Sequence, residues 1–243
     1  MPSLSGTNMF QPKDEKSYRN SWTTKKVLSL PGLSQELRDS YTEMKAQQDR
    51  AKEVVREFVQ GAVTGSPERM LACFDEIEMG IGEPSGGWVG VMRAVSRQPS
   101  VPRVTREFFL RVFIKWGDHL RQECSDLVLA DGLRMLLPKY KGPAKHLYRG
   151  ESFLNRRRRT YGLSWSASAD VARCHAEKTL CRSSPGGSVL LETMAPADAI
   201  ISRIPASKDH YREEEYVVDR RRLTSVKVIQ RFAQMKVKTR AKG

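Results

Sequence analysis

The sequence has 243 residues, of which 39% are hydrophobic and 29% are charged. This length suits one or two domains with a buried core, and the composition excludes a chain that is disordered throughout. The 42 Lys and Arg residues outnumber the 28 Asp and Glu residues and give a formal net charge of +14. Such a charge favours polyanionic partners, namely nucleic acid, an anionic membrane surface or acidic proteins.

Both ends of the chain are expected to extend from the folded part. Residues 1–33 are polar, rich in Ser, Thr and Lys and without periodicity, which predicts a flexible basic arm. Residues 220–243 contain nine Lys or Arg and no Asp or Glu, and residues 233–243 are expected to form a basic tail.

Residues 34–141 are expected to be mainly helical. Ser34 is predicted to cap a first helix, and Ser66 followed by Pro67 predicts the start of a second. The clearest amphipathic pattern begins at Thr105. It predicts a core-facing stripe of Phe108, Phe109, Val112, Phe113, Trp116 and Leu120.

Two more helices are expected in this region. The Gly, Pro and Ser-rich stretch 80–102 predicts loops with a short helix near residues 88–96, and residues 125–137 predict a helix that stops at Pro138. The helical region either recognises substrate, binds an inhibitor such as an antitoxin protein, or braces the part that follows.

Residues 142–232 are expected to be rich in strands, with one clear helix at residues 169–180. The candidate inward positions of this helix are Val171, Ala172, His175, Ala176 and Leu180. The fold class is therefore α+β, a helical region followed by a sheet. The short strand candidates are residues 146–150, 162–168, 187–194, 199–204, 215–219 and 224–232.

Two strand candidates carry groups suited to a phosphorylated ligand. Arg149 ends a short apolar strand, where its guanidinium fork matches a phosphate, and Gly150 lets a ligand approach the backbone. Ser164 and Ser166 lie on one face of a strand and Trp165 on the other. The two hydroxyls can bind a ribose or orient a carboxylate, although each motif alone is also typical of a turn or an edge strand.

Three acids precede the strand at residues 215–219. The period of a strand places Glu213 and Glu215 on one face and Glu214 on the other. Two carboxylates in one cleft can divide two tasks, the stabilisation of positive charge and the activation of an acceptor. The alternative interpretation is a solvated loop end.

Taken in order, these motifs resemble the R-S-E class of mono-ADP-ribosyltransferases of bacterial and phage type. Arg149 in LYRG is followed fifteen residues later by Ser164-Trp165-Ser166, and Glu213-x-Glu215 begins forty-nine residues beyond Ser164. The segment ADVARCHA also resembles the helix that follows the serine motif in that family. The resemblance covers residues 142–232 and implies a split, strand-rich fold that binds NAD.

The resemblance also implies an NAD-binding set. Arg149 is expected to contact the NAD phosphates or the adjacent ribose, and the Gly150 backbone to hold the nicotinamide carboxamide. Tyr148, Trp165 and Ser166 complete this set.

Catalysis is assigned by the same resemblance. Glu215 is the expected catalytic glutamate, and Ser164 orients it. Glu213 positions or deprotonates the acceptor, and Tyr211 recognises it. An E-x-E pair in this family commonly accompanies arginine as the acceptor.

Two alternatives in register stay open. Ser166 and Ser168 are a second possible serine pair, although Ser168 also suits the N-cap of the next helix. Glu214 is a second possible catalytic acid, provided that a bulge turns it toward the cleft.

The function implied is transfer of ADP-ribose from NAD, a co-substrate, to a protein side chain or nucleic acid, with release of nicotinamide. The protein would be a toxin, an effector or a phage-related factor. The alternatives are an NAD glycohydrolase and a non-catalytic basic module that binds nucleic acid. The run Arg156–Arg159 is either a solvated basic loop or an electrostatic guide for NAD or a polyanionic acceptor.

The remaining composition predicts the compartment and the absence of a metal. Four scattered cysteines form neither a disulfide framework nor a Cys-x-x-Cys pair, so a reducing compartment is expected. Cys174, His175 and Cys181 match no common zinc spacing, so no metal is expected. No apolar run of about 18 residues and no signal-peptide pattern occur. A cytoplasmic protein without a membrane partner is expected, delivered into a target cell if it is an effector.

Overall fold

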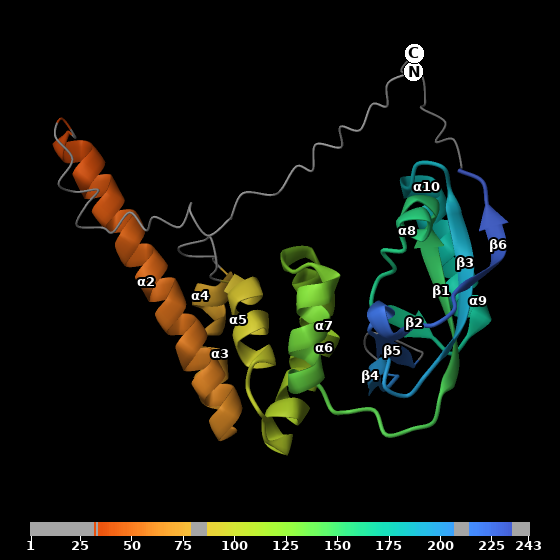
Figure 1. Ribbon diagram of the computed structural model, residues 1–243, viewed down its shortest axis with the longest axis horizontal. Coiled ribbons are helices and arrows are strands. Elements are labelled where there is room, and N and C mark those ends of the chain that lie inside the picture. Colours follow the sequence, from red (N-terminus) through yellow and green to blue (C-terminus); the bar gives the residue numbers. More distant parts are fainter. Residues whose placement is uncertain (1–31, 33, 79–86, 207–213, 235–243) are drawn as a thin grey trace, which may run out of the picture. The chain divides into compact units, whose positions relative to one another are not determined.

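The computed structural model describes residues 32, 34–78, 87–206 and 214–234 (Figure 1). The chain divides into two compact units, Met1–Ala46 and Gln47–Gly243. Almost all of the predicted arm and tail lies outside the described residues. The boundary expected between residues 141 and 142 falls between a helix that ends at Leu136 and the first strand, which begins at Lys145, and both of these elements lie in the second unit.

Helix α2 spans Gln35–Thr64 and belongs to both units. The Ser34 hydroxyl accepts a hydrogen bond from the Leu37 amide at 3.3 Å, which confirms the predicted N-cap. Its buried residues are confined to the half that lies in the second unit: Ala51, Val54, Phe58, Gly61 and Ala62.

Among the described residues that follow, five shorter helices precede the sheet: α3 (Pro67–Ala72), α4 (Phe74–Glu78), α5 (Gly87–Ser96), α6 (Arg103–Glu123) and α7 (Asp126–Leu136). Ser66 caps α3 as predicted, and α5 and α7 confirm the helices expected near residues 88–96 and 125–137. The apolar stripe of α6 is largely confirmed, since Phe109, Phe113 and Leu120 are buried. Trp116 was wrongly placed in the core, because its side chain lies at the edge of the aromatic cluster and is 36% exposed.

The strand-rich part forms one six-stranded sheet of order β4-β5-β2-β1-β3-β6, and every neighbouring pair is antiparallel. The α+β class is therefore confirmed. The strands are β1 (Lys145–Ser152), β2 (Ser164–Ser166), β3 (Ser188–Ala195), β4 (Ile200–Ile204), β5 (Glu215–Val218) and β6 (Lys227–Phe232).

Strands β1 and β2 pair only at Tyr148 and Ser166, whereas β1 pairs with β3 along its whole length. Because Ser166 is the last residue of β2, Ser164 and Trp165 have no ladder partner on β1. This gap in the ladder opens the sheet between β1 and β2.

The predicted helix at residues 169–180 is present with an irregular middle. It consists of α9 (Ala169–Cys174), a π-helical turn (His175–Leu180) and α10 (Cys181–Ser183). Ser168 caps α9, its hydroxyl accepting from the Val171 amide at 3.4 Å. Ala172 and Ala176 are buried as predicted, but His175 is exposed, because the buried stripe of this helix is carried by the two alanines.

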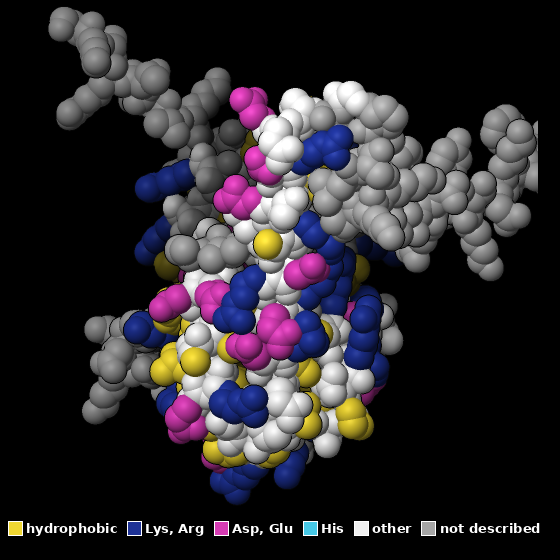
Figure 2. Space-filling view, turned by 90° about the vertical axis from the view of Figure 1, so that its left-hand side faces the viewer, with side chains coloured by type: hydrophobic (Ala, Val, Ile, Leu, Met, Phe, Trp, Pro, Cys, Tyr) yellow, Lys and Arg dark blue, Asp and Glu magenta, His cyan; other side chains and the backbone are white. Residues whose placement is uncertain are grey.

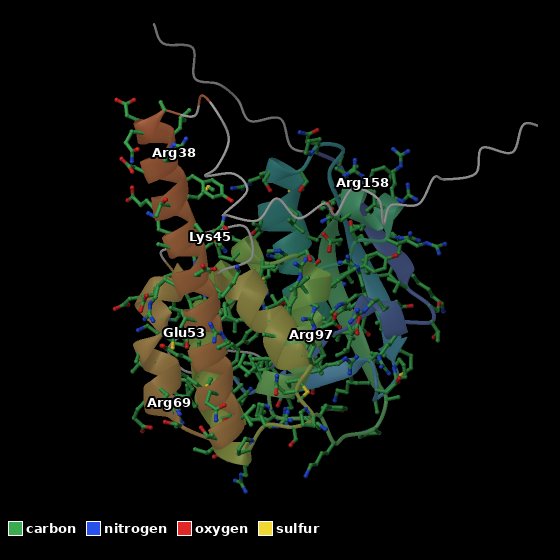
Figure 3. All side chains as sticks on the ribbon, turned by 60° about the vertical axis from the view of Figure 1, so that its left-hand side comes forward. Arg38, Lys45, Glu53, Arg69, Arg97 and Arg158 are labelled. Carbon is green, nitrogen blue, oxygen red and sulfur yellow. The ribbon has the colours of Figure 1, made fainter. Side chains whose placement is uncertain are left out.

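The run Arg156–Arg159 is not a loop, because its first three arginines form the C-terminal half of helix α8 (Phe153–Arg158), which Ser152 caps. Arg159 ends that helix in the left-handed conformation, with a φ of 56°. Arg157, Arg158 and Arg159 are exposed, and Figure 3 labels Arg158 on this helix.

Two apolar cores lie on the two sides of the sheet. The larger core joins the helices to Leu163, Ile201, Ile204 and Val217 of the strand-rich part. The smaller core contains Trp165 with residues of β1, β3 and β5. None of the helices within the described ranges is long and apolar enough to cross a membrane.

Candidate functional site

A cavity of about 400 Å³ opens where β1 and β2 separate. Residues from β1, β2, α6, α9 and the start of β5 line it, so both the helical and the strand-rich parts contribute. The lining residues are Asp118, Arg121, Tyr148, Arg149, Gly150, Ser164, Trp165, Ser166, Val171, Ala172, His175, Glu214 and Glu215.

Every described residue of the expected NAD-binding and catalytic sets borders this cavity, whereas Ser168 of the alternative serine pair does not line it and caps α9 instead. The predicted residues Glu213 and Tyr211 lie outside the described part of the chain. The residues brought together are Tyr148, Arg149, Gly150, Ser164, Trp165, Ser166 and Glu215.

The Arg149 guanidinium is fixed across the opening between β1 and β2. Its Nε donates to a Glu151 oxygen at 2.8 Å, and its Nη1 donates to the Ser164 carbonyl. A Cβ at position 162 would lie 2.3 Å from Nη2, so Gly162 leaves the space that the guanidinium fills. Arg149 is thus preorganised, with a side chain that is 19% exposed.

Glu151 is the buried counter-ion of Arg149, with only 3% of its surface exposed. It also accepts from the Ser152 amide at 2.9 Å, the Asn155 side chain at 3.0 Å and the Gly162 amide at 3.1 Å. Burial alone would raise its pKa, but the Arg149 charge and these donors hold the pKa of Glu151 below its usual value. We did not predict Glu151, although it shares the strand face of Arg149.

Gly150 allows a helix, rather than only a ligand, to approach β1. An added Cβ would lie 2.6 Å from the Ala172 carbonyl oxygen and 2.7 Å from the Ala176 amide nitrogen. Both atoms are backbone and cannot move aside. The glycine therefore sets how closely α9 and the π-helical turn pack on the floor of the cavity.

The serines of β2 face the cavity, and Trp165 faces the smaller core, as strand alternation predicts. The Trp165 side chain is 2% exposed, and its Nε1 donates to the Gly162 carbonyl at 3.2 Å. In the register of β2 and β5, Ser166 lies opposite Glu215, whereas Ser164 lies opposite Val217. The hydroxyl nearest to Glu215 across the strands is therefore that of Ser166, which accepts from the Ser168 amide at 3.0 Å.

Glu215 begins β5 and is held by an arginine from α6. Arg121 Nη2 donates to Glu215 Oε1 at 2.6 Å, and Arg121 Nη1 donates to Asp118 at 2.7 Å. The side chains of Arg121 and Glu215 are 22% and 13% exposed. The two residues are 94 positions apart, and no sequence pattern connects them, so we did not predict this pair.

Glu214 lines the cavity, but its carboxylate binds side chains that do not line it. Its carboxylate pairs with Arg203 of β4 and accepts from the Tyr216 hydroxyl at 3.0 Å. Burial would raise its pKa, but the hydrogen bonds from Arg203 and Tyr216 hold the pKa of Glu214 below its usual value. Its carboxylate is thus engaged on the β4 side of β5.

His175 borders the cavity next to Arg149. Partial desolvation and the positive charge of Arg149 lower the pKa of His175 against the opposing charges of Glu151 and Asp118, which favours the neutral imidazole. A neutral ring here can donate or accept a hydrogen bond without adding charge to the site.

Together, these groups suit a ligand with phosphates and hydroxyls. Arg121 and Arg149 offer guanidinium donors for phosphate, Ser164 and Ser166 offer hydroxyls for a ribose, and Glu215 offers a carboxylate. The volume lies within the usual range for small-molecule pockets, roughly 300–1,000 Å³. In the described parts of the chain, no group of three His, Cys, Asp or Glu side chains is placed to hold a metal ion.

Comparisons with protein families, with curated proteins and with solved structures found no match to this chain.

Proposed function

We propose that this protein cleaves NAD at the bond between nicotinamide and ribose and transfers ADP-ribose to a macromolecular acceptor. The observation that carries the proposal is the convergence of Arg149, Ser164, Ser166 and Glu215 on one cavity. These residues were chosen from sequence order alone and come from three different strands. The single contact between β1 and β2 also supports a split, ADP-ribosyltransferase-like sheet.

Binding rests on preorganised donors. Arg149 is held by Glu151 and the Ser164 carbonyl, so its guanidinium loses little freedom when it binds an NAD phosphate. The Gly150 backbone borders the same cavity and takes the nicotinamide carboxamide. Tyr148 and the two serines supply a ring face and hydroxyls for the adjoining ribose.

Chemistry rests on the Glu215 carboxylate. The C1′–N bond breaks, its electron pair leaves with nicotinamide, and positive charge develops on the ribose. A carboxylate that accepts the ribose 2′-hydroxyl stabilises this charge, as carboxylates do in glycoside cleavage. Ser166, opposite Glu215 in the strand register, keeps that carboxylate oriented. The acceptor atom then bonds to C1′ and releases its proton to a base, for which we propose Glu213.

The acceptor is a protein side chain such as arginine, or a nucleic acid. The exposed arginines 157–159 of α8 and the net charge of +14 favour a polyanionic partner. However, basic and acidic side chains are interspersed on the face shown in Figure 2, where no continuous basic surface is visible. The acceptor therefore has to be found by experiment.

Incubation with NAD labelled in its adenylate phosphate distinguishes the candidates. The full chain is mixed separately with cell lysate, total RNA and DNA, and the label is followed. Label in protein or in nucleic acid supports transfer and identifies the acceptor class. Label only in free ADP-ribose selects a glycohydrolase. NAD that stays intact in every mixture contradicts the proposal and leaves a non-catalytic binding module.

A further inference from the structure

The ion pair between Arg121 and Glu215 blocks the proposed catalytic carboxylate. Arg121 Nη2 lies 2.6 Å from Glu215 Oε1, so this oxygen is engaged before any substrate arrives. In the proposed reaction the same carboxylate accepts the ribose 2′-hydroxyl. The pair therefore has to rearrange, or Arg121 has to take part in the reaction.

The surroundings of Arg121 show which of its contacts can be exchanged. Asp118 is 76% exposed, so solvent weakens its hold on Arg121. Arg121 Nε is buried and has no hydrogen-bond partner among the residues that the structure describes, so within that part of the chain the guanidinium has an unused donor. The guanidinium also lies 5.2 Å from the centre of the Phe113 ring, which keeps it at the cavity.

Arg149 is less able than Arg121 to exchange its carboxylate partner for an incoming anion. Its partner Glu151 is 3% exposed and is held by three further donors, so Arg149 keeps this carboxylate partner while it offers its guanidinium to a phosphate. Arg121 is thus the cavity guanidinium whose positive charge an incoming anion can capture.

We propose that Arg121 is a second diphosphate-binding residue, which leaves Glu215 for the NAD diphosphate and so frees the catalytic carboxylate. The identity of the anion as NAD rests on the proposed function. The exchange itself needs only a diphosphate, because a diphosphate offers more charge and more acceptor oxygens than one carboxylate. The helical region then contributes directly to substrate binding through α6.

The exchange is tested by binding of ADP-ribose, measured by calorimetry, to wild type, Arg121→Met, Glu215→Gln and the double variant. Methionine keeps the aliphatic packing against Phe113 and removes the charge. Arg121→Met is expected to weaken binding roughly 10- to 100-fold, the usual range for losing a charged hydrogen bond. Glu215→Gln is expected to tighten binding about 3- to 10-fold, because Arg121 no longer has to leave a carboxylate.

The double variant is expected to bind like Arg121→Met, since the gain from Glu215→Gln needs Arg121. Adenosine, which lacks the diphosphate, is expected to bind all four proteins equally. Arg103→Ala and Glu107→Gln are matched controls, because they break an exposed ion pair on the same helix, outside the cavity lining. Neither is expected to change ADP-ribose binding.

Steady-state kinetics distinguish an Arg121 that binds the diphosphate from an Arg121 that only orients Glu215. If Arg121 binds the diphosphate, Arg121→Met raises KM for NAD more than it lowers kcat. If Arg121 only orients Glu215, kcat falls and KM is unchanged, which would overturn the inference. Weaker ADP-ribose binding by Glu215→Gln, or no binding by the wild type, would overturn it as well. The expected ADP-ribose pattern without NAD turnover would support the diphosphate site and contradict only the proposed function.

Discussion

The buried pair of Arg149 and Glu151 is the most tightly specified part of the cavity. One carboxylate accepts from two backbone amides, the Asn155 side chain and the arginine, and the guanidinium spans the opening to the Ser164 carbonyl. Arg149 was expected to face a cleft because it ends a short apolar strand before a glycine, and strand alternation places Glu151 on the same face. The carboxylate was missed because an acid in a strand of this length is usually solvated.

Removal of Glu151 should damage both stability and binding. Glu151→Ala leaves Arg149 and the Gly162 amide without their partner and is expected to cost about 3–5 kcal/mol of unfolding free energy. ADP-ribose binding should weaken as well, because the guanidinium loses its anchor. Chemical denaturation and calorimetry measure the two effects. Glu192→Gln, which alters a partly exposed ion pair with His146, is the control and should change stability by less than about 1 kcal/mol.

The same residue gives a pH dependence with a defined sign. The pKa of Glu151 in the folded protein is below its usual value of 4.5. Its stabilising contribution is therefore complete above about pH 4.5 and is lost as pH falls through the lower folded pKa. The stability difference between wild type and Glu151→Ala should shrink below pH 4 in denaturation at several pH values. A difference that grows on acidification would contradict this assignment.

At the scale of elements, periodicity predicted the helices and strands well but not their mutual contacts. Each strand candidate became a strand, because apolar and β-branched residues alternate within short segments bounded by turn formers. The sheet order and the π-helical turn were not predictable, since both depend on contacts distant in sequence. The close approach at Gly150 is one such contact.

Two glycine substitutions distinguish close packing from backbone propensity. Gly150→Ala places a Cβ within 2.7 Å of helix backbone atoms and should destabilise the protein by about 1–3 kcal/mol. For Gly117→Ala in the middle of α6, the nearest atoms to the added Cβ belong to the Phe113 ring at 3.5 Å, an ordinary van der Waals contact, and alanine favours a helix. It should be neutral or stabilise by up to about 1 kcal/mol. Thermal unfolding measures both, and equal effects would contradict the role assigned to Gly150.

At the scale of the second unit, the helices and the sheet share a core and a set of ion pairs. Asp219, which follows β5 and is 1% exposed, accepts from Arg134 of α7 at 3.1 Å and from Arg221 at 2.9 Å. The ion pairs of Asp219 with Arg134 and Arg221, together with the shared apolar core, indicate that α7 and the sheet unfold together. Hydrophobic periodicity distinguishes the helices from the strands, but it carries no information on contacts between them, so the site that both surround was not predictable.

Loss of Asp219 tests this coupling. Asp219→Ala removes the acceptor shared by Arg134 and Arg221 and should lower the unfolding free energy by about 1–3 kcal/mol. Helical and tryptophan signals should still change in one transition. Asp198→Asn alters an exposed pair with Arg222 and should stay within about 0.5 kcal/mol of wild type. Two separate transitions in the wild-type protein would contradict a shared core.

The central claim concerns Glu215, and release of nicotinamide from NAD tests it most directly. Wild type and the control Glu192→Gln should release nicotinamide at equal rates. Glu215→Gln should release nicotinamide at least about 100-fold more slowly, which is the scale of losing one transition-state charge contact. Thermal unfolding of this variant should show that it is folded. Nicotinamide release by Glu215→Gln at the wild-type rate, or none by the wild type with any acceptor, would contradict the account.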